Sequence, residues 1–366
     1  MQGMKINELA RQLNISARAI RFYEEKGMIR PGKDPGNGYR LFSQRDALRL
    51  RIIVTLREFG MGVGEVKRLL ELLDRGLREE AVYVLEQQRS AMFDRWMEGK
   101  RNLDAADFMI RQLQGERGPE WEDLFELAGG LKRRRQLRDG WRDAWDFDSR
   151  AAVHDELVKG TDSSGGRHPA YTTTLRMMVE CVLPAPGERG LDAGTGTGNL
   201  AGLFTEAGAF MAGIDQSMEM LKQCRRKFPQ VETRLGNLLS IPYVDGSFDF
   251  VASSYALRHL THEQKHVALS EMKRVLKPHG RICIADLMYG EEGSPGDGLP
   301  EMDAAGTVTG SLDMPVYYAH CRELLEWFGR NGYLAAVHHI SGAVHMIYAV
   351  PVQRGPLPAE AGEFQT

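Results

Sequence analysis

Residues 191 to 200 read Leu-Asp-Ala-Gly-Thr-Gly-Thr-Gly-Asn-Leu, with glycine at every second position from 194 to 198. A predicted strand precedes this run and a predicted helix, Asn199 to Ala207, follows it. Glycine lets the backbone approach a ligand closely at such a turn. The dinucleotide fingerprint would place glycine at 199, where this chain has Asn199. The spacing therefore favours a nucleoside that carries an amino-acid tail over a nicotinamide dinucleotide.

A carboxylate ends the next predicted strand. Asp215 stands at the end of Gly213-Ile-Asp215, 23 residues after Asp192. At this position a carboxylate can accept hydrogen bonds from both hydroxyls of a ribose. The pair predicts a nucleoside site at the carboxyl ends of two neighbouring strands.

Strands and helices alternate outward from the glycine run. This alternation predicts an α/β doubly wound (Rossmann-like), mostly parallel sheet with helices on both faces. The two last strands, separated by Ser341-Gly342, are expected to pair antiparallel. The seven expected strands are residues 190–192, 210–214, 231–235, 248–253, 281–286, 335–340 and 344–350.

The N-terminal region has the pattern of an all-α helix-turn-helix with a wing. Apolar positions from Ile6 to Leu13 share one helical face, and Ser16 can cap a second helix from Ala17 to Glu25. A turn cluster at 34–38 and a strand from Tyr39 to Phe42 predict a short hairpin. The second helix carries Arg18, Arg21 and Tyr23, residue types that bind phosphates and base edges.

The net charge of −3 for 366 residues is unevenly distributed along the chain. Residues 1–78, which we call the head, are basic, and the rest of the chain is acidic. Residues 1–78 contain 16 Lys and Arg against 9 Asp and Glu, a net +7; the rest contain 31 against 41, a net −10. Clustered cations attract nucleic-acid phosphates. A solvated charged face would give the same count, so charge alone does not decide. The length exceeds the roughly 250 to 300 residues at which single cores stop growing, which predicts at least two cores.

A long helix is expected after the head. Steps of three and four residues from Val82 give a seam in which eight of ten positions are apolar. Such a seam can form an antiparallel coiled coil between two copies, or it can pack on its own chain. The seam residues are Val82, Leu85, Arg89, Met92, Trp96, Gly99, Leu103, Ala106, Ile110 and Leu113.

The expected domain boundaries are 1–78 for the head, 79–115 for the long helix, 116–140 for a connector, 141–351 for the α/β domain and 352–366 for a disordered tail. The connector reads as a hinge with helical pieces. Its basic run, Lys132 to Arg135, is either a DNA-flank contact or a solvated cluster. The glycine-rich segments 160–166 and 290–298 are either mobile lids or plain surface loops.

The four cysteines form no Cys-x-x-Cys pair, which favours a reduced cytoplasm without disulfides or a zinc site. We expect no bound metal. No apolar stretch approaches the roughly 20 residues that span a bilayer, and no signal peptide is evident. The sequence therefore indicates a cytoplasmic protein without a membrane partner.

The head resembles the MerR family of transcription regulators. The resemblance rests on residues 6–29 and on Asn37-Gly-Tyr-Arg-Leu-Phe42, and it extends through a second helical pair ending near Leu73. It implies DNA contacts by Arg18, Tyr23, Tyr39 and Arg40, although packing is an alternative role for the two tyrosines. It further implies a homodimer on double-stranded operator DNA and RNA polymerase at the promoter.

The chain from about Trp141 to Val350 resembles the class I methyltransferases that use S-adenosylmethionine. Beside the glycine run, Gly236-Asn-Leu238, Asp245-Gly-Ser-Phe-Asp249 and residues 274–280 carry the resemblance. It implies that the methionine moiety lies near Asp192 and Gly194, the cofactor along Gly196, the ribose at Asp215 and adenine at Asn237 and Leu238. Many relatives have Asp at 237; an amide oxygen can still accept from the adenine amino group. Thr195, Gly198 and Gln216 complete the candidate cofactor residues for S-adenosylmethionine or S-adenosylhomocysteine.

Catalytic residues are hard to identify because methyl transfer to a nucleophilic acceptor depends largely on alignment. The candidates are Tyr255 and His259, which follow the fourth strand; His259 could take a proton near neutral pH. A structural histidine bonded to backbone is the alternative. Trp141, Trp145, Asp146 and Tyr171 stand where similar enzymes have a flexible cover, although helix packing also accounts for the tryptophans.

Two functions follow from this combination. In the first, the chain is a MerR-type regulator whose C-terminal domain binds S-adenosylmethionine, its demethylated product or another small-molecule effector, and alters the DNA-bound dimer. In the second, it is an active methyltransferase of a small molecule with an autoregulatory DNA-binding head. A nicotinamide-dependent oxidoreductase is disfavoured by the glycine spacing.

Overall fold

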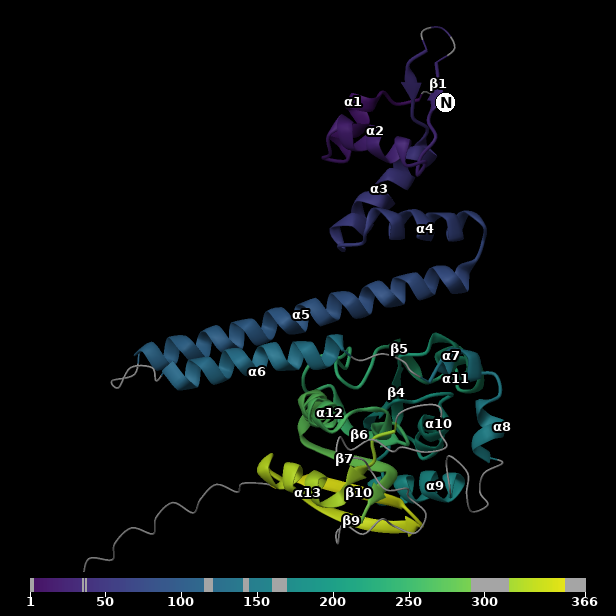
Figure 1. The fold of residues 1–366 in the computed structure, drawn as a ribbon. Helices are drawn as coiled ribbons and strands as arrows, with labels where there is room; N and C mark the ends of the chain where they lie inside the picture. The colour runs from purple at the N-terminus through teal and green to yellow at the C-terminus, as the bar shows by residue number, and fades with distance from the viewer. Residues whose placement is uncertain are drawn as a thin grey trace, which may run out of the picture. The chain divides into compact units, whose positions relative to one another are not determined.

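The computed structural model describes residues 3–34, 36, 38–114, 121–140, 145–159, 170–290 and 316–352. Contacts between Cα atoms divide the chain into two compact units, Met1–Gly99 and Lys100–Thr366 (Figure 1). Trp141, the segment 160–166, residues 291–298 and the chain after Val352 lie outside the described residues, so the expectations placed on them stay untested.

The first unit is a helix-turn-helix with a wing and a second helical pair. The Ser16 hydroxyl accepts a hydrogen bond from the Ala19 amide at 3.1 Å and caps the second helix, as the sequence predicts. The wing strands pair antiparallel, with Gly32 opposite Leu41. The elements are α1 Ile6–Gln12, α2 Ala17–Glu25, β1 Gly32–Lys33, β2 Arg40–Leu41, α3 Gln44–Glu58 and α4 Val63–Asp74.

The helix α5, Arg78–Gln114, follows as one continuous element. Ala81 and Val84 on one face of its first turns are buried in the core of the first unit, against residues such as Leu70. The predicted seam lies on another face and is exposed. Its large apolar members are Val82, Leu85, Met92, Trp96, Leu103, Ile110 and Leu113, all at least 39% exposed.

The second unit is built on one sheet with the strand order β5-β4-β3-β6-β7-β10-β9. The first five strands in this order are parallel, and β10 pairs antiparallel with both β7 and β9, which confirms the doubly wound prediction and the final hairpin. The bounds are β3 Arg189–Ala193, β4 Phe210–Asp215, β5 Glu232–Leu235, β6 Phe248–Ser254, β7 Leu276–Tyr289, β9 Tyr333–Ser341 and β10 Val344–Pro351.

A short strand that was not expected from the sequence, β8 Ala319–His320, pairs with the end of β7. Two residues are too few to show a period of two, so no pattern could have revealed this strand. Strand β7 also begins earlier than expected, directly after the helix that precedes it.

Helices cover both faces of the sheet (Figure 1). Helices α9 Tyr171–Val182, α10 Asn199–Glu206 and α11 Met218–Lys227 pack on one face, around Phe204 and Phe250. Helices α12 His262–Val275 and α13 Cys321–Arg330 pack on the other, around Leu269 and Phe328. A 3-10 turn, η1 Leu257–His259, joins β6 to α12. The carboxyl ends of β3, β4 and β6 therefore meet at one edge, as a ligand site in this fold requires.

Between α5 and α9 the described residues form α6 Trp121–Asp139, α7 Phe147–Arg150 and α8 His154–Lys159. Helix α6 continues through Gly129-Gly130 and the basic run, where the sequence indicated only helical pieces. The Leu137 carbonyl of α6 accepts a hydrogen bond from Gln264 of α12 at 3.0 Å, and Arg133 pairs with Glu263. Within the described ranges, no helix combines the length and apolar character of a membrane span.

Candidate functional site

The glycine run forms a tight loop between β3 and α10. Gly194, Gly196 and Gly198 all have positive φ angles, of 81°, 54° and 85°, which L side chains rarely adopt. A Cβ at Gly194 would lie 2.6 Å from the Ala256 Cβ, and one at Gly198 would lie 2.4 Å from the Cys224 Sγ. The loop can therefore close against its surroundings only with glycine at these positions.

Asp192 ends β3 below this loop and is fully buried. Its Oδ2 accepts hydrogen bonds from the Thr195 hydroxyl at 2.8 Å and the Ala201 amide at 3.2 Å. Its Oδ1 is buried and has no partner among the described residues. Burial raises the pKa of Asp192 to about 7. A buried acceptor without a donor is unfavourable, so this oxygen suits a donor that arrives with a ligand.

Asp215 ends β4 and is held by the backbone on both sides. Its Oδ2 accepts a hydrogen bond from the Gly196 amide at 2.9 Å, and its Oδ1 accepts one from the Ser217 amide at 2.9 Å. Gln216, the next residue, is half-buried. The two bonds fix the orientation of the carboxylate and tie it to the glycine loop, as expected for residues of one site.

Asn237 and Leu238 follow β5 at the same edge of the sheet. The Leu238 Cδ1 lies 3.6 Å from a Cβ built at Gly194, so Leu238 borders the glycine loop. The Asn237 side-chain oxygen accepts hydrogen bonds from the amides of Leu239 at 2.9 Å and Ser240 at 3.1 Å. This oxygen closes a local turn, and the Nδ2 donors are what Asn237 can offer to a ligand.

The segment before β3 is tied to the site by two carboxylates that the sequence analysis did not select. Asp148 accepts hydrogen bonds from the Ser217 hydroxyl at 2.6 Å and the Glu219 amide at 3.2 Å. Asp155 accepts from Thr197 at 2.5 Å, from Asn199 at 3.1 Å and from Lys227 at 2.5 Å. Both residues lie on short helices with no distinctive spacing, so only the fold reveals them.

Trp145, Asp146 and Tyr171, the expected cover residues that the structure describes, precede β3 in the second unit. Trp145 is buried, and its ring meets the His259 ring edge-on with 4.8 Å between centroids. The Tyr171 hydroxyl accepts a hydrogen bond from Asn199 at 3.1 Å. Asp146 adopts a positive φ of 48° directly before α7. Trp145 therefore has the packing contacts that the sequence allowed for it, and its role as a cover stays a prediction.

Tyr255 and His259, the catalytic candidates, differ in their surroundings. Tyr255 has a positive φ of 53° after β6, and its hydroxyl lies 3.0 Å from the Thr174 hydroxyl. His259 packs edge-on against Trp145 and Phe147, and its Nδ1 is buried without a partner in the described residues. Burial, with Arg258 and Lys265 nearby, holds the pKa of His259 well below its usual range. The imidazole is therefore neutral near pH 7 and a weaker base than the sequence suggested.

A buried charged cluster follows the carboxyl ends of β6 and β7. The Arg258 amide donates to Asp286 at 3.1 Å, and its guanidinium lies 3.9 Å from the same carboxylate. Lys265 donates to the carbonyls of Leu260 and Tyr317, each at 2.6 Å. Burial lowers the pKa of Lys265 to about 7 and raises that of Asp286. Arg258 and Asp286 stand within apolar stretches of the sequence, which is the signal that could have revealed them; Lys265 stands among polar residues and has no such signal.

The predicted DNA-binding residues lie on α2 and the wing. Arg18 and Arg21 are exposed, Tyr39 is 73% exposed, and Tyr23 is half-buried on the head core. Arg40 donates to both oxygens of Glu24 on α2, at 2.8 and 2.7 Å. Arg40 therefore joins the wing to the second helix in addition to any contact with DNA.

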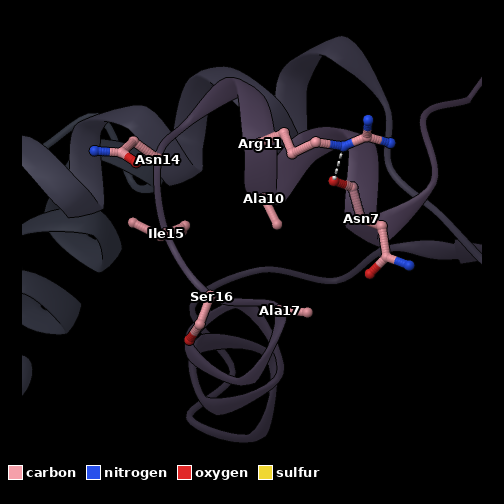
Figure 2. Close-up of a pocket in the computed structure, with 7 residues that line it drawn as sticks. All are labelled: Asn7, Ala10, Arg11, Asn14, Ile15, Ser16 and Ala17. Atoms are coloured by element: carbon pink, nitrogen blue, oxygen red, sulfur yellow. Dashed lines mark hydrogen bonds between the residues drawn. The ribbon is translucent and has the colours of Figure 1, made fainter.

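A hollow of about 500 Å³ lies at the turn between α1 and α2 (Figure 2). Arg11 is its one charged lining residue, and its Nε donates to the Asn7 carbonyl at 3.3 Å. No group of three or more His, Cys, Asp or Glu in the described part of the chain could hold a metal ion. All four cysteines are free.

Comparison with known proteins assigns both units. A MerR HTH family regulatory protein model matches residues 4–73, and a methyltransferase domain model matches residues 191–284. An uncharacterized methyltransferase of Alkaliphilus oremlandii is 32% identical over 206 residues, which cover 56% of this chain and 94% of that protein. A demethylmenaquinone methyltransferase of Renibacterium salmoninarum is 36% identical over 114 residues, 31% of this chain and 47% of that protein.

Among solved structures, a putative S-adenosylmethionine dependent methyltransferase from Listeria monocytogenes matches with a TM-score of 0.42 and 18% identity. The match covers 50% of this chain and all of that chain. The two family models match separate parts of the chain, residues 4–73 in the first unit and residues 191–284 in the second. The chain belongs to the methyltransferase family and carries a MerR helix-turn-helix domain at residues 4–73.

Proposed function

We propose that the chain is a MerR-type transcription regulator whose methyltransferase domain binds S-adenosylmethionine or S-adenosylhomocysteine and couples this binding to promoter control. The observation that carries the proposal is a pair of carboxylates at the ends of neighbouring strands. Asp215 accepts a hydrogen bond from the Gly196 amide, and Asp192 lies below the same loop with one buried oxygen that has no partner among the residues that the structure describes. A nucleoside with an α-amino acid tail supplies a diol for the first carboxylate and an ammonium for the second.

The residues at the strand ends fit such a cofactor. Asp215 would accept from the ribose hydroxyls, and Leu238 would lie against adenine beside Gly194. Asn237 would donate from Nδ2 to a ring nitrogen, because its oxygen already accepts two backbone hydrogen bonds. Thr195 and Gly198 would border the amino-acid tail without donating to its carboxylate, because their amides already donate to the carbonyls of Ile214 and Thr195. Bound S-adenosylmethionine supplies a methyl group activated by its sulfonium.

The DNA-binding half of the proposal uses the exposed cations of α2 and the apolar seam of α5. Arg18, Arg21 and Tyr39 would contact operator DNA, with Tyr23 and Arg40 at the edge of the surface. A second copy would cover the seam, since large apolar side chains in a continuous exposed row favour association. Two heads would then read two half-sites, and RNA polymerase would be the further partner at the promoter. We place the regulator in the cytoplasm.

Turnover is the second candidate function. The buried cluster of Arg258, Asp286 and Lys265 favours it, because perturbed ionisable groups gather where chemistry occurs. The acceptor would be a small molecule bound beyond Tyr255, with Arg258 stabilising negative charge on its nucleophilic atom. His259 and Tyr255 would align the acceptor and exclude water, and an acceptor that is already nucleophilic needs no strong base.

The test uses operator duplexes selected by the full-length protein from a random library. Operator affinity is measured at fixed salt by fluorescence anisotropy, with and without S-adenosylhomocysteine, beside calorimetric binding of the same ligand. We expect measurable ligand heat, a change in operator affinity, and about a 10- to 100-fold weaker ligand affinity in Asp215→Ala, from the loss of two hydrogen bonds to a charged acceptor. No heat for the wild type, or equal heat for both proteins, would reject the nucleoside site.

A methyl-release assay on candidate acceptors separates the two functions. Rapid methyl transfer with an operator affinity that never responds to ligand would establish the enzyme and reject the sensor. An operator response without transfer would support the regulator alone.

A further inference from the structure

A buried loop connects β5 to β6 and includes the residues that we place at adenine. From Leu238 to Tyr243 every residue is buried, although the segment contains neither helix nor strand. Backbone amides and carbonyls that are buried outside regular structure need partners from elsewhere. The loop therefore depends on the side chains around it.

Helix α12 supplies these partners. The Ile241 amide donates to the Glu271 Oε2 at 3.1 Å, and the Ile241 carbonyl accepts from Arg274 at 2.8 Å. Arg274 also donates to the Tyr243 carbonyl at 2.7 Å and to Glu271 at 2.7 Å. Two side chains of one helix thus hold the loop three to six residues beyond Leu238 and Asn237.

The same network reaches α5. Arg101 donates to the Glu271 Oε1 at 2.8 Å, and Lys100 lies 2.9 Å from Asp245, which also pairs with Arg274. The Glu271 side chain is 5% exposed and that of Arg101 16% exposed. At buried positions, where the dielectric constant is low, ion pairs and hydrogen bonds are strong and resist rearrangement. The Arg101 Nη1 is buried without a partner in the described residues, so this position is not optimised for stability alone.

We propose that Glu271 is the positioning residue that couples the adenine loop to the long helix, with one carboxylate oxygen on the loop and the other on Arg101. This inference rests on the proposed function, because it takes Asn237 and Leu238 as the adenine contacts. The Asn237 oxygen bonds the amides of Leu239 and Ser240, so displacement of Asn237 by a ligand moves the turn that ends at Ile241.

Helix α5 carries the effect onward because it is continuous from Arg78 to Gln114 and its first turns are part of the head core. A ligand can change operator affinity only by binding two states of this arrangement unequally. Equilibrium linkage then requires that operator DNA change ligand affinity by the same factor. Loss of the contact between Arg101 and Glu271 should reduce both changes together and leave ligand binding itself intact.

Hydrogen exchange of the full-length protein tests the link without DNA. In the wild type, S-adenosylhomocysteine should slow exchange at residues 237–245 and also at residues 98–106 of α5. In Arg101→Met, the protection should remain at 237–245 and disappear from 98–106. Arg133→Met is the matched control, because Arg133 also pairs with a glutamate of α12, at an exposed site; it should behave as the wild type.

Operator binding supplies the second measurement. In the wild type, S-adenosylhomocysteine should change operator affinity by about 5-fold or more, a typical coupling between two sites. In Arg101→Met the change should be less than about 2-fold, and the affinity for the ligand in the absence of DNA should be unchanged. Glu271→Gln keeps an acceptor for Ile241 and loses the charge for Arg101 and Arg274, so the same reduction in coupling is expected, and this variant serves if Arg101→Met fails to fold. Coupling is the ratio of operator affinities with and without saturating ligand, so a weaker ligand affinity of Glu271→Gln does not affect this comparison.

Protection of α5 that persists in both variants, or that never occurs in the wild type although 237–245 is protected, would overturn the inference and leave the nucleoside site standing. Absence of any ligand protection would instead reject the proposed function, and the link with it.

Discussion

Thr197 in the glycine loop donates a hydrogen bond to Asp155 of α8, with 2.5 Å between the two oxygens. Lys227 of α11 donates to the same carboxylate at 2.5 Å. One residue before the sheet thus holds the loop after β3 and the helix after β4 together. The segment 145–159 therefore forms part of the site, and disruption of its contacts should weaken ligand binding.

Asp155→Asn tests this segment. The variant keeps an oxygen for Thr197 but loses the charge that pairs with Lys227, so we expect S-adenosylhomocysteine affinity to fall about tenfold by calorimetry. Burial raises the pKa of Asp155, but bonds from Lys227 and Thr197 outweigh it and bring the pKa below its ordinary value. The carboxylate is therefore ionised at every pH from 5 to 8, and the loss should be constant over this range. A loss that vanished at pH 8 would contradict the assignment.

Asp192 should give the opposite pH behaviour. Its pKa is raised by burial from 3.8 to about 7, so the folded state holds the proton more tightly than the unfolded state. The free energy of unfolding should fall as pH rises from about 4 to about 7, by an amount on the order of a few kcal/mol, and should level off above pH 7. Urea unfolding at a series of pH values measures this fall, which Asp192→Asn should lack.

Ligand binding should follow the same ionisation. The Asp192 carboxylate attracts an ammonium only when it is ionised, so S-adenosylhomocysteine affinity should increase between pH 6 and pH 8. The Asn variant should bind weakly at every pH. A flat wild-type profile would remove Asp192 from the ligand contacts.

Gly198→Ala should destabilise the methyltransferase domain by about 2 to 4 kcal/mol. The new Cβ would adopt a left-handed backbone, which costs roughly 1 to 2 kcal/mol, and would meet Cys224 at 2.4 Å. Gly187→Ala is the matched control, since Gly187 has a φ of 86° and open space around its Cβ. It should show the backbone penalty alone. Equal midpoints of urea unfolding for the two variants would show that contact with Cys224 is unimportant.

The seam of α5 predicts the oligomeric state. Leu103 and Ile110 are 68% and 50% exposed, and a second copy would bury them. The double variant Leu103→Glu, Ile110→Glu should sediment as a monomer at concentrations where the wild type is a dimer. Leu334→Glu on β9, where the native leucine is 70% exposed, should leave the dimer intact. A dimer in both variants would locate the interface elsewhere.

Arg18 should contribute a phosphate contact. Each phosphate neutralised on duplex DNA adds about 0.9 to the slope of log affinity against log salt, so Arg18→Ala should reduce the slope by about that amount. Arg330→Gln, an exposed arginine of α13, is the control and should leave the slope unchanged. Anisotropy titrations at four salt concentrations measure both, and an unchanged slope for Arg18→Ala would place Arg18 away from the backbone of DNA.

The sequence predicts those parts of the site that depend on local order along the chain. Asp192 and Asp215 lie in the last two residues of their strands and the glycines follow β3 directly, so strand prediction places all of them at one edge of the sheet. Asp155 and Glu271 could not be found this way. Glu271 pairs with Arg101, a residue 170 positions away, and Asp155 contacts Asn199 at a distance of 44 positions. No period or motif encodes such contacts, because they arise only when helices of the second unit dock on the sheet.

The paired side chains of Glu24 and Arg40 bear on how operator preference could be re-engineered. Glu24 belongs to α2 and Arg40 to β2. If α2 were replaced by the corresponding helix of a relative, the hairpin would lose its ion pair to this helix unless residue 24 stayed acidic. Libraries that randomise α2 alone should therefore retain Glu24, and libraries that aim at new half-sites should vary positions 24 and 40 jointly.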